Sequence, residues 1–94
     1  MIDTHGRRGC RRRVLIADDD AAIRSMLSLF LEQEGYEVET AENGVDALKR
    51  FEVRRFNLVM LAYYLPDIDG LQVASLIHGQ DPDVTLVLMY AITG

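Results

Sequence analysis

Short apolar runs and amphipathic segments alternate along this chain. The runs over residues 14–17, 56–61 and 84–89 are apolar almost throughout, which is typical of strands that are buried on both faces of a sheet. The segment 36–39 alternates apolar and acidic residues instead, which predicts a strand with one wet face or an edge position. The pattern therefore predicts four strands.

A first helix is predicted after the strand over 14–17. It follows Asp18, Asp19 and Asp20, whose carboxylates are suited to capping the amino terminus of a helix. Gly35 is the expected stop. One apolar stripe at i, i+3, i+4, i+7 and i+8 should face the core, and it consists of Ile23, Met26, Leu27, Phe30 and Leu31.

Two more helices follow the next two strands. The turn signal Asn43-Gly44 opens a helix that runs to about Arg54. Its inward residues are expected to be Val45, Ala47, Leu48 and Phe51. After a turn-rich loop over 65–70, a short helix over 71–78 ends near Gly79. The order βαβαβαβ, with apolar strands, predicts a parallel α/β sheet with right-handed crossovers.

Composition and charge narrow the function classes. The chain has 94 residues, enough for one small domain, and 49% of them are hydrophobic and 27% charged. Cys10 is the only cysteine, which excludes an internal disulfide and favours a reducing, cytoplasmic location. No apolar run approaches the roughly 18 residues of a membrane span. We therefore expect no membrane partner.

The net charge of −5 is unevenly distributed. Residues 1–13 carry +4, from five arginines and Asp3, whereas residues 14–94 carry −9. We interpret 1–13 as a flexible basic tail and 14–94 as the domain. A nucleic-acid-binding arm is the alternative, because arginine neutralises phosphates, although no aromatic residue or reading helix accompanies it. A secretory signal would need a longer apolar segment after the arginines.

Candidate chemistry lies at the carboxyl ends of the strands, where ligands bind in such sheets. Asp18 and Asp19 follow the first strand, and two adjacent carboxylates there can hold a hard cation such as Mg²⁺. A cap of three aspartates on the following helix is the alternative, and their mutual repulsion slightly favours the metal. The residues after the third strand are Ala62, Tyr63 and Tyr64, and Tyr90 follows the fourth.

These segments, taken together, resemble a response-regulator receiver domain, a CheY-like module. Val14–Asp20 is similar to the opening of that family, and Ala41–Leu48 to its second turn and helix. Leu58–Leu61 and Leu65–Gly70 are similar to its third strand and the loop that follows. The resemblance covers residues 14–94. It implies a flavodoxin-like parallel sheet in the order 2-1-3-4-5. It also implies a phosphorylation switch, in which a histidine kinase donates a phosphoryl group to an aspartate beside Mg²⁺.

By the same resemblance, Asp18, Asp19 and the backbone carbonyl of Tyr64 match the Mg²⁺ ligands. Ala62 takes the position of the phosphoacceptor aspartate, and Tyr90 that of the switch serine or threonine. A methyl group cannot accept phosphate, and the loss of one carboxylate should weaken Mg²⁺ binding. We expect the Tyr90 ring to occupy the space left above Ala62.

The function expected from these departures is a receiver-like domain of a two-component (phosphorelay) response regulator. It should be incompetent for phosphorylation, lack enzymatic activity and act through protein contacts with a histidine kinase or an output domain. The first alternative is an active receiver that uses another carboxylate, although Asp67 and Asp69 are better explained as turn residues. The second is a nucleic-acid-binding module that depends on the basic tail or on an attached output domain.

The resemblance also implies a fifth strand and the last helices, which these 94 residues do not supply. The fourth strand should then be an open edge, and one face of the sheet should lack a second helix. We expect either self-association through that edge or face, or that the chain is a piece of a longer protein.

Overall fold

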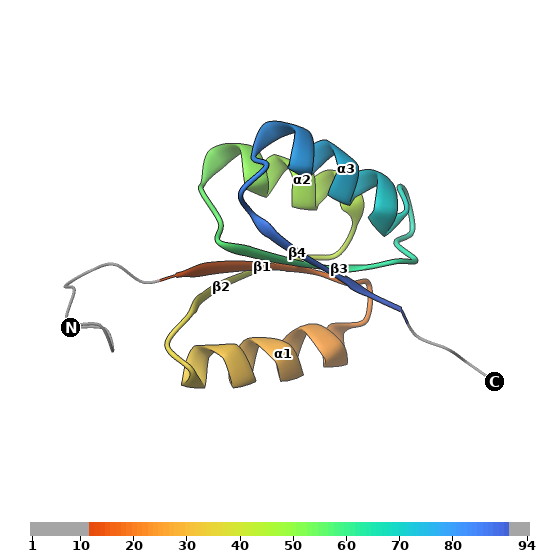
Figure 1. Ribbon diagram of the computed structural model, residues 1–94. Coiled ribbons are helices and arrows are strands. Elements are labelled where there is room, and N and C mark those ends of the chain that lie inside the picture. Colours follow the sequence, from red (N-terminus) through yellow and green to blue (C-terminus); the bar gives the residue numbers. More distant parts are fainter. Residues whose placement is uncertain (1–11, 91–94) are drawn as a thin grey trace.

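A computed structural model describes residues 12–90 of the chain as one parallel α/β sheet with three helices (Figure 1). In chain order the elements are β1 (Arg13–Ala17), α1 (Ala21–Gln33), β2 (Glu37–Ala41), α2 (Gly44–Val53), β3 (Leu58–Ala62), α3 (Gly70–Gln80) and β4 (Thr85–Met89). All seven predicted elements are present. Residues 1–11 of the predicted basic tail lie outside the described residues.

The strand order is β2-β1-β3-β4, and every neighbouring pair is parallel. The flavodoxin-like prediction is thus confirmed for four strands, and β2 lies at an edge as its alternating pattern indicated. Helix α1 covers one face of the sheet, whereas α2 and α3 lie side by side on the other (Figure 1). Because the strands are parallel, their carboxyl ends meet along one edge of the molecule.

The helices begin where the capping residues predicted. The side chain of Asp20 accepts a hydrogen bond from the amide of Ala22 at 2.9 Å, and Asn43 and Asp69 cap α2 and α3 in the same way. Gly35 has a φ of +97°, the left-handed conformation that favours glycine after a helix. Helix α3 differs from the prediction, since it continues through Gly79 to Gln80.

The core lies between the sheet and the pair α2 and α3. Side chains from β1, β2, β3 and both helices meet there with two that precede β3 and β4. They are Leu15, Ala17, Ala41, Ala47, Phe51, Phe56, Val59, Leu61, Val73, Ala74, Ile77 and Val84. On the opposite face, Val14 and Ile16 are fully buried, although they do not belong to this cluster.

The face that carries α1 is covered less completely than the apolar stripe predicted. Met26 and Phe30 are 61% and 60% exposed, and no residue of α1 is buried. The prediction that these two residues face the core is therefore wrong. Val87 is also exposed on β4. The physical reason is that α1 is the only helix on this face within residues 12–90, and one helix is too narrow to cover four strands.

One prediction about α2 also needs correction. Ala47 and Phe51 are buried and Leu48 packs against the core, as expected, but Val45 is 43% exposed. Val45 lies in the first turn of the helix, beside the solvent-exposed carboxylate of Asp67. The periodicity predicted that Val45 faces the core, but the first turn of α2 extends beyond the core.

Candidate functional site

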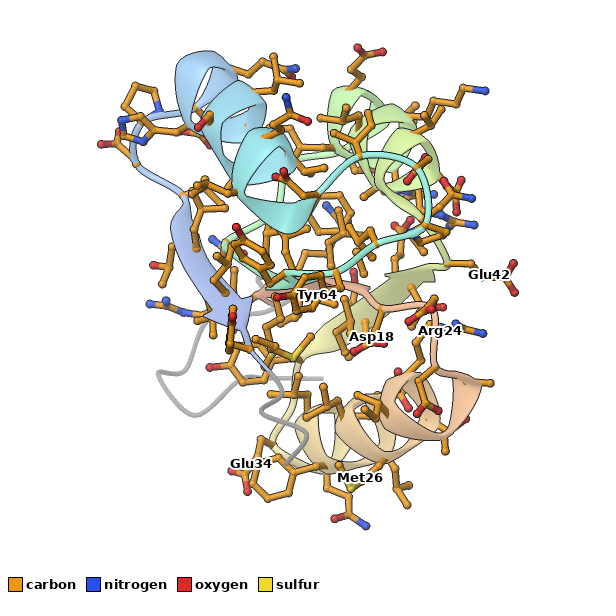
Figure 2. All side chains as sticks on the ribbon, turned by 90° about the vertical axis from the view of Figure 1, so that its right-hand side faces the viewer. Asp18, Arg24, Met26, Glu34, Glu42 and Tyr64 are labelled. Atoms are coloured by element: carbon orange, nitrogen blue, oxygen red, sulfur yellow. The ribbon has the colours of Figure 1, made fainter. Side chains whose placement is uncertain are left out.

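The predicted site residues lie at the carboxyl end of the sheet. Asp18 directly follows β1, Ala62 is the last residue of β3, and Tyr90 directly follows β4. Ala62 pairs in register with Met89, the residue before Tyr90. Figure 2 looks onto this end and shows Asp18 and Tyr64 there. The topology therefore brings these sequence-distant positions to one edge.

Asp18 is the only buried charged residue within residues 12–90, with 7% of its surface exposed. Its Oδ1 atom accepts a hydrogen bond from the amide of Asp20 at 2.9 Å. Burial raises the pKa of the Asp18 carboxyl, whereas the hydrogen bond from the amide of Asp20 lowers it. The negative charges of Asp19 and Asp20 raise it further, and the net shift is upward. The charged form of this carboxylate is thus less favourable than that of an exposed aspartate.

Arg24 contacts this acidic corner, and the sequence reasoning did not single it out. Its Nη1 atom donates a hydrogen bond to the backbone carbonyl of Asp18 at 2.7 Å, and its Nη2 atom lies 3.4 Å from Oε1 of Glu42. Only 15% of its side chain is exposed. The guanidinium therefore ties the first turns of α1 to the ends of β1 and β2 (Figure 2). The only sequence signal was a lone arginine in an apolar helix.

The oxygen donors for Mg²⁺ at this end are limited. Asp18 and Asp19 supply two carboxylates, of the hard oxygen type that Mg²⁺ prefers. Among the residues that the structure describes, no group of three or more His, Cys, Asp or Glu side chains could hold a metal ion. Asp18 and Asp19 could hold such an ion, which would keep most of its waters.

Ala62 lies in a tightly packed turn at the end of β3. It is 8% exposed, and a Cβ placed on Gly70 would meet its carbonyl oxygen and carbon. The amide of Gly70 donates to the carbonyl of Tyr63 at 2.7 Å, which closes the loop between β3 and α3. This loop therefore needs glycine at position 70, because any side chain would enter the backbone beside Ala62.

Three tyrosine rings lie together at the carboxyl end of the sheet. The ring of Tyr63 packs edge-on against Tyr64 and against Tyr90, with centroids 4.9 Å and 5.2 Å away. The hydroxyl oxygens of Tyr64 and Tyr90 are 3.2 Å apart. Tyr90 is 59% exposed, so its ring is part of an exposed aromatic cluster and is not enclosed in a space above Ala62.

The two aspartates of the loop before α3 are engaged elsewhere. Oδ1 of Asp67 accepts from the amide of Gly44 at 2.8 Å, and Oδ2 accepts from that of Val45 at 2.9 Å. Oδ1 of Asp69 accepts from the amide of Gln72 at 2.8 Å and caps α3. The hydrogen bonds from the amides of Val45 and Gly44 lower the pKa of Asp67, and the bond from Val45 has the largest effect. Asp69 thus caps α3, as the turn interpretation expected, whereas Asp67 stabilises the start of α2, which that interpretation did not predict.

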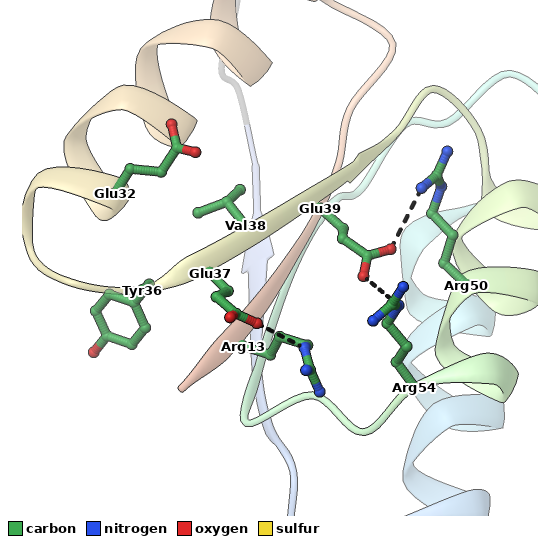
Figure 3. Close-up of a pocket in the computed structure, with 8 residues that line it drawn as sticks. All are labelled: Arg13, Glu32, Tyr36, Glu37, Val38, Glu39, Arg50 and Arg54. Carbon is green, nitrogen blue, oxygen red and sulfur yellow. Dashed lines mark hydrogen bonds and ion pairs between the residues drawn. The ribbon is translucent and has the colours of Figure 1, made fainter. Parts of the chain in front are cut away.

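A separate open pocket of about 500 Å³ lies along the edge strand β2 (Figure 3). Arg13 pairs with Glu37 at 3.0 Å, and Glu39 lies between Arg50 at 3.4 Å and Arg54 at 3.0 Å. Each of these guanidinium groups faces a carboxylate. The pocket begins at the amino ends of β1 and β2, away from Asp18 and Ala62, so it adds nothing to the predicted site.

Comparisons with known proteins agree with this geometry. The family model described as "Response regulator receiver domain" matches residues 14–93. The CAI-1 autoinducer sensor kinase/phosphatase CqsS of Vibrio cholerae is 34% identical over 88% of this chain and 12% of its own length. The chain spans about a third or less of the length of the first curated relatives that it matches.

Solved structures show the same fold. A CheY-like receiver domain protein of Methanospirillum hungatei has a TM-score of 0.86 at 33% identity, over 90% of this chain and 68% of that one. TrrA of Thermotoga maritima, in complex with Mg²⁺-BeF, has a TM-score of 0.82 at 41% identity, over 87% and 71%. TrrA in complex with the histidine kinase ThkA has a TM-score of 0.80 at 41% identity, over 88% and 72%.

Proposed function

Because this chain belongs to the family of response regulator receiver domains, we propose that it is a receiver of a two-component system that cannot be phosphorylated. In this proposal it acts through protein contacts and has no enzymatic activity. The observation that carries it is the identity of residue 62, an alanine at the carboxyl end of β3. Its methyl group has no lone pair with which to attack a phosphoryl donor.

The surroundings of Ala62 support this interpretation. The two nearest alternative aspartates in sequence, Asp67 and Asp69, accept hydrogen bonds from helix amides. A carboxylate that moved to attack a phosphoryl donor would lose those bonds and leave amides at a helix terminus unpaired. Asp18 is buried, and its Oδ1 is bonded to the amide of Asp20.

We also propose that Mg²⁺ binds weakly at Asp18, Asp19 and the backbone carbonyl of Tyr64. TrrA is a related protein that was solved with Mg²⁺-BeF. In this chain, however, alanine at position 62 contributes no charge to an ion at this edge. When bound, the ion would screen the repulsion between the two aspartates. Replacing Ala62 with aspartate should therefore strengthen Mg²⁺ binding.

The proposed partners are proteins of a signalling pathway. TrrA was solved with a histidine kinase, and we propose a kinase or an output domain as the partner of this chain as well. Self-association is a further proposal, through the open edge of β4 or the exposed apolar side chains beside α1. Within residues 12–90, no helix has the length and apolar character to cross a membrane. A cytoplasmic location remains part of the proposal.

Intact-mass spectrometry after incubation with acetyl phosphate and Mg²⁺ tests the proposal. We expect the chain to gain no phosphoryl group. The Ala62→Asp variant restores a carboxylate nucleophile and should gain one. The Ala62→Asn variant is the matched control, because its amide has a similar size but is not a nucleophile for this reaction, and it should gain none.

Each other outcome has a defined meaning. A phosphoryl gain by the unaltered chain would mean that another residue accepts the group, and the proposal would be wrong. A gain by neither the chain nor Ala62→Asp would show that residue 62 is not the sole obstacle. The double variant Ala62→Asp, Tyr90→Thr then tests whether the tyrosine ring blocks access.

A further inference from the structure

The three tyrosines at the carboxyl end connect two segments that are distant in sequence. Tyr63 and Tyr64 begin the loop after β3, whereas Tyr90 directly follows β4. The rings of Tyr64 and Tyr90 have centroids 5.7 Å apart and are tilted by 48°, and Tyr63 contacts both. The aromatic cluster, which we define as Tyr63, Tyr64 and Tyr90, thus links the loop to the end of β4.

The cluster continues a connection that the backbone begins. Ala62 and Met89 form the last residue pair of the β3–β4 ladder, and the amide of Tyr63 donates to the carbonyl of Met89 at 2.8 Å. Past this point the chain after β3 turns back toward α3, where the amide of Gly70 bonds the carbonyl of Tyr63. The bond between the hydroxyls of Tyr64 and Tyr90 is a further contact between the two segments.

Burial in the core does not explain the positions of these rings. Tyr64 is 63% exposed and Tyr90 is 59% exposed, so most of their surface faces solvent. A tyrosine with that exposure loses side-chain entropy when it is ordered and needs a specific partner in compensation. The partners here are the other rings of the cluster, in the edge-on and tilted arrangements that aromatic pairs favour.

We propose that Tyr64 and Tyr90 form a side-chain tie that holds the loop after β3 to the end of β4. Tyr90 is the first residue after β4, so the tie joins the end of that strand to the loop. The tie consists of side-chain contacts, so this proposal does not rest on whether residue 62 accepts a phosphoryl group.

Ionisation of the phenols should act on the tie. The hydrogen bond with Tyr90 raises the pKa of the Tyr64 hydroxyl, as does the repulsion that two phenolates would experience. Because a phenolate still accepts a hydrogen bond from the remaining hydroxyl, this bond is lost only when both oxygens are deprotonated, well above the ordinary tyrosine pKa of about 10. This behaviour is a secondary consequence, since the ring contacts do not depend on it.

Hydrogen exchange by mass spectrometry on the full chain, without Mg²⁺ or a phosphodonor, tests the tie. We expect Tyr64→Ala to speed exchange by roughly tenfold both in the loop 63–69 and in the peptide that contains the end of β4. Tyr90→Ala should speed exchange in the same two segments. Tyr64→Phe keeps the ring and loses only the hydroxyl, so its effect should be smaller.

Tyr36→Ala and Tyr36→Phe are the matched controls. Tyr36 precedes β2 at the opposite end of the sheet (Figure 3), and its replacement should leave both segments unchanged. The double variant Tyr64→Ala, Tyr90→Ala should exchange at about the rate of either single variant, because the tie is already broken in each. Additive effects, or faster exchange only in the segment that carries the substitution, would overturn the proposal.

A second measurement covers the case in which an alanine variant unfolds. The chain has no tryptophan and only four tyrosines, so its near-ultraviolet circular dichroism reports mainly on these rings. We expect Tyr64→Phe and Tyr90→Phe to reduce that signal by equal amounts and more than Tyr36→Phe does. Equal effects of all three variants would show that the rings of the cluster are not held together.

Discussion

The carboxylate of Asp67 lies at the amino terminus of α2 and accepts a hydrogen bond from the amide of Gly44 at 2.8 Å. Its other oxygen accepts from the amide of Val45 at 2.9 Å. Asp67 belongs to the loop between β3 and α3, so it acts as a cap for a helix that begins 23 residues earlier in the chain. Asn43 caps the same helix locally by accepting from the amide of Asp46.

We predict that Asp67→Ala lowers the melting temperature, since it leaves two amides of α2 without this acceptor. Asp67→Asn keeps one carbonyl oxygen and should lower it less. The folded-state pKa of Asp67 is depressed, so its stabilising effect is present above the ordinary aspartate pKa of about 3.9 and lost as the pH falls below it. Thermal unfolding at pH 7 and pH 3 measures the difference.

Asp83→Ala, at an exposed aspartate before β4, is the control for this prediction. It changes the net charge by the same amount at a position where no helix begins. A loss of stability at pH 7 equal to that of Asp67→Ala would assign the effect to charge alone.

A second prediction concerns the glycine that closes the loop after β3. The variant Gly70→Ala places a Cβ against the carbonyl of Ala62 and within 3.0 Å of Cα of Tyr63, where the backbone cannot yield cheaply. We expect the free energy of unfolding to fall by about 2 kcal/mol or more. Urea unfolding followed by far-ultraviolet circular dichroism provides the measurement.

Gly79→Ala in the same helix is the matched control. A Cβ at position 79 meets nothing within 4 Å, and the residue is helical. This substitution should leave stability unchanged or raise it by about 0.5–1 kcal/mol. Similar losses in both variants would contradict the argument from the contact with Ala62.

The sequence predicts the strands and the helix starts because these depend on local signals. Apolar runs mark β1, β3 and β4, and the caps at Asp20, Asn43 and Asp69 are each next to the helix that they begin. The family resemblance supplies the order of the strands. Local pattern and fold thus agree on the type and order of the seven elements.

Contacts between distant segments could not be predicted in this way. The bond from Arg24 to the carbonyl of Asp18 and the cap of α2 by Asp67 depend on how the loops are placed after folding. The exposure of Met26 and Phe30 has a related cause. Periodicity identifies the apolar side of a helix, but not whether a second helix lies beside it.

The same exposed side chains lead to a third prediction. Phe30 on α1 is 60% exposed and Val87 on β4 is 38% exposed, and β4 has no strand on its outer side within residues 12–90. We predict that the chain self-associates in a concentration-dependent manner. Phe30→Glu or Val87→Lys should raise the dissociation constant by about tenfold or more, because each introduces a charge into an apolar contact. Sedimentation velocity over a range of concentrations measures this.

Val53→Glu is the control for the self-association prediction. Val53 is 79% exposed at the end of α2, on the other face of the sheet from α1. Its replacement should leave the dissociation constant unchanged. A chain that sediments as a folded monomer at every concentration would contradict the prediction.

The last prediction concerns the buried carboxyl of Asp18, whose pKa is raised mainly by burial. A raised folded-state pKa means that protonation favours the folded state, so stability falls as the pH rises through that pKa. Asp18→Asn has no charge and retains an oxygen for the amide of Asp20. It should therefore be more stable than the parent at pH 7, and the difference should shrink near pH 4.

Asp19→Asn, at an exposed position, should show a smaller difference. Added Mg²⁺ should stabilise the parent and not Asp18→Asn, since only the parent keeps both carboxylates. A variant that is less stable than the parent at pH 7 would show that the charge of Asp18 is compensated within the fold.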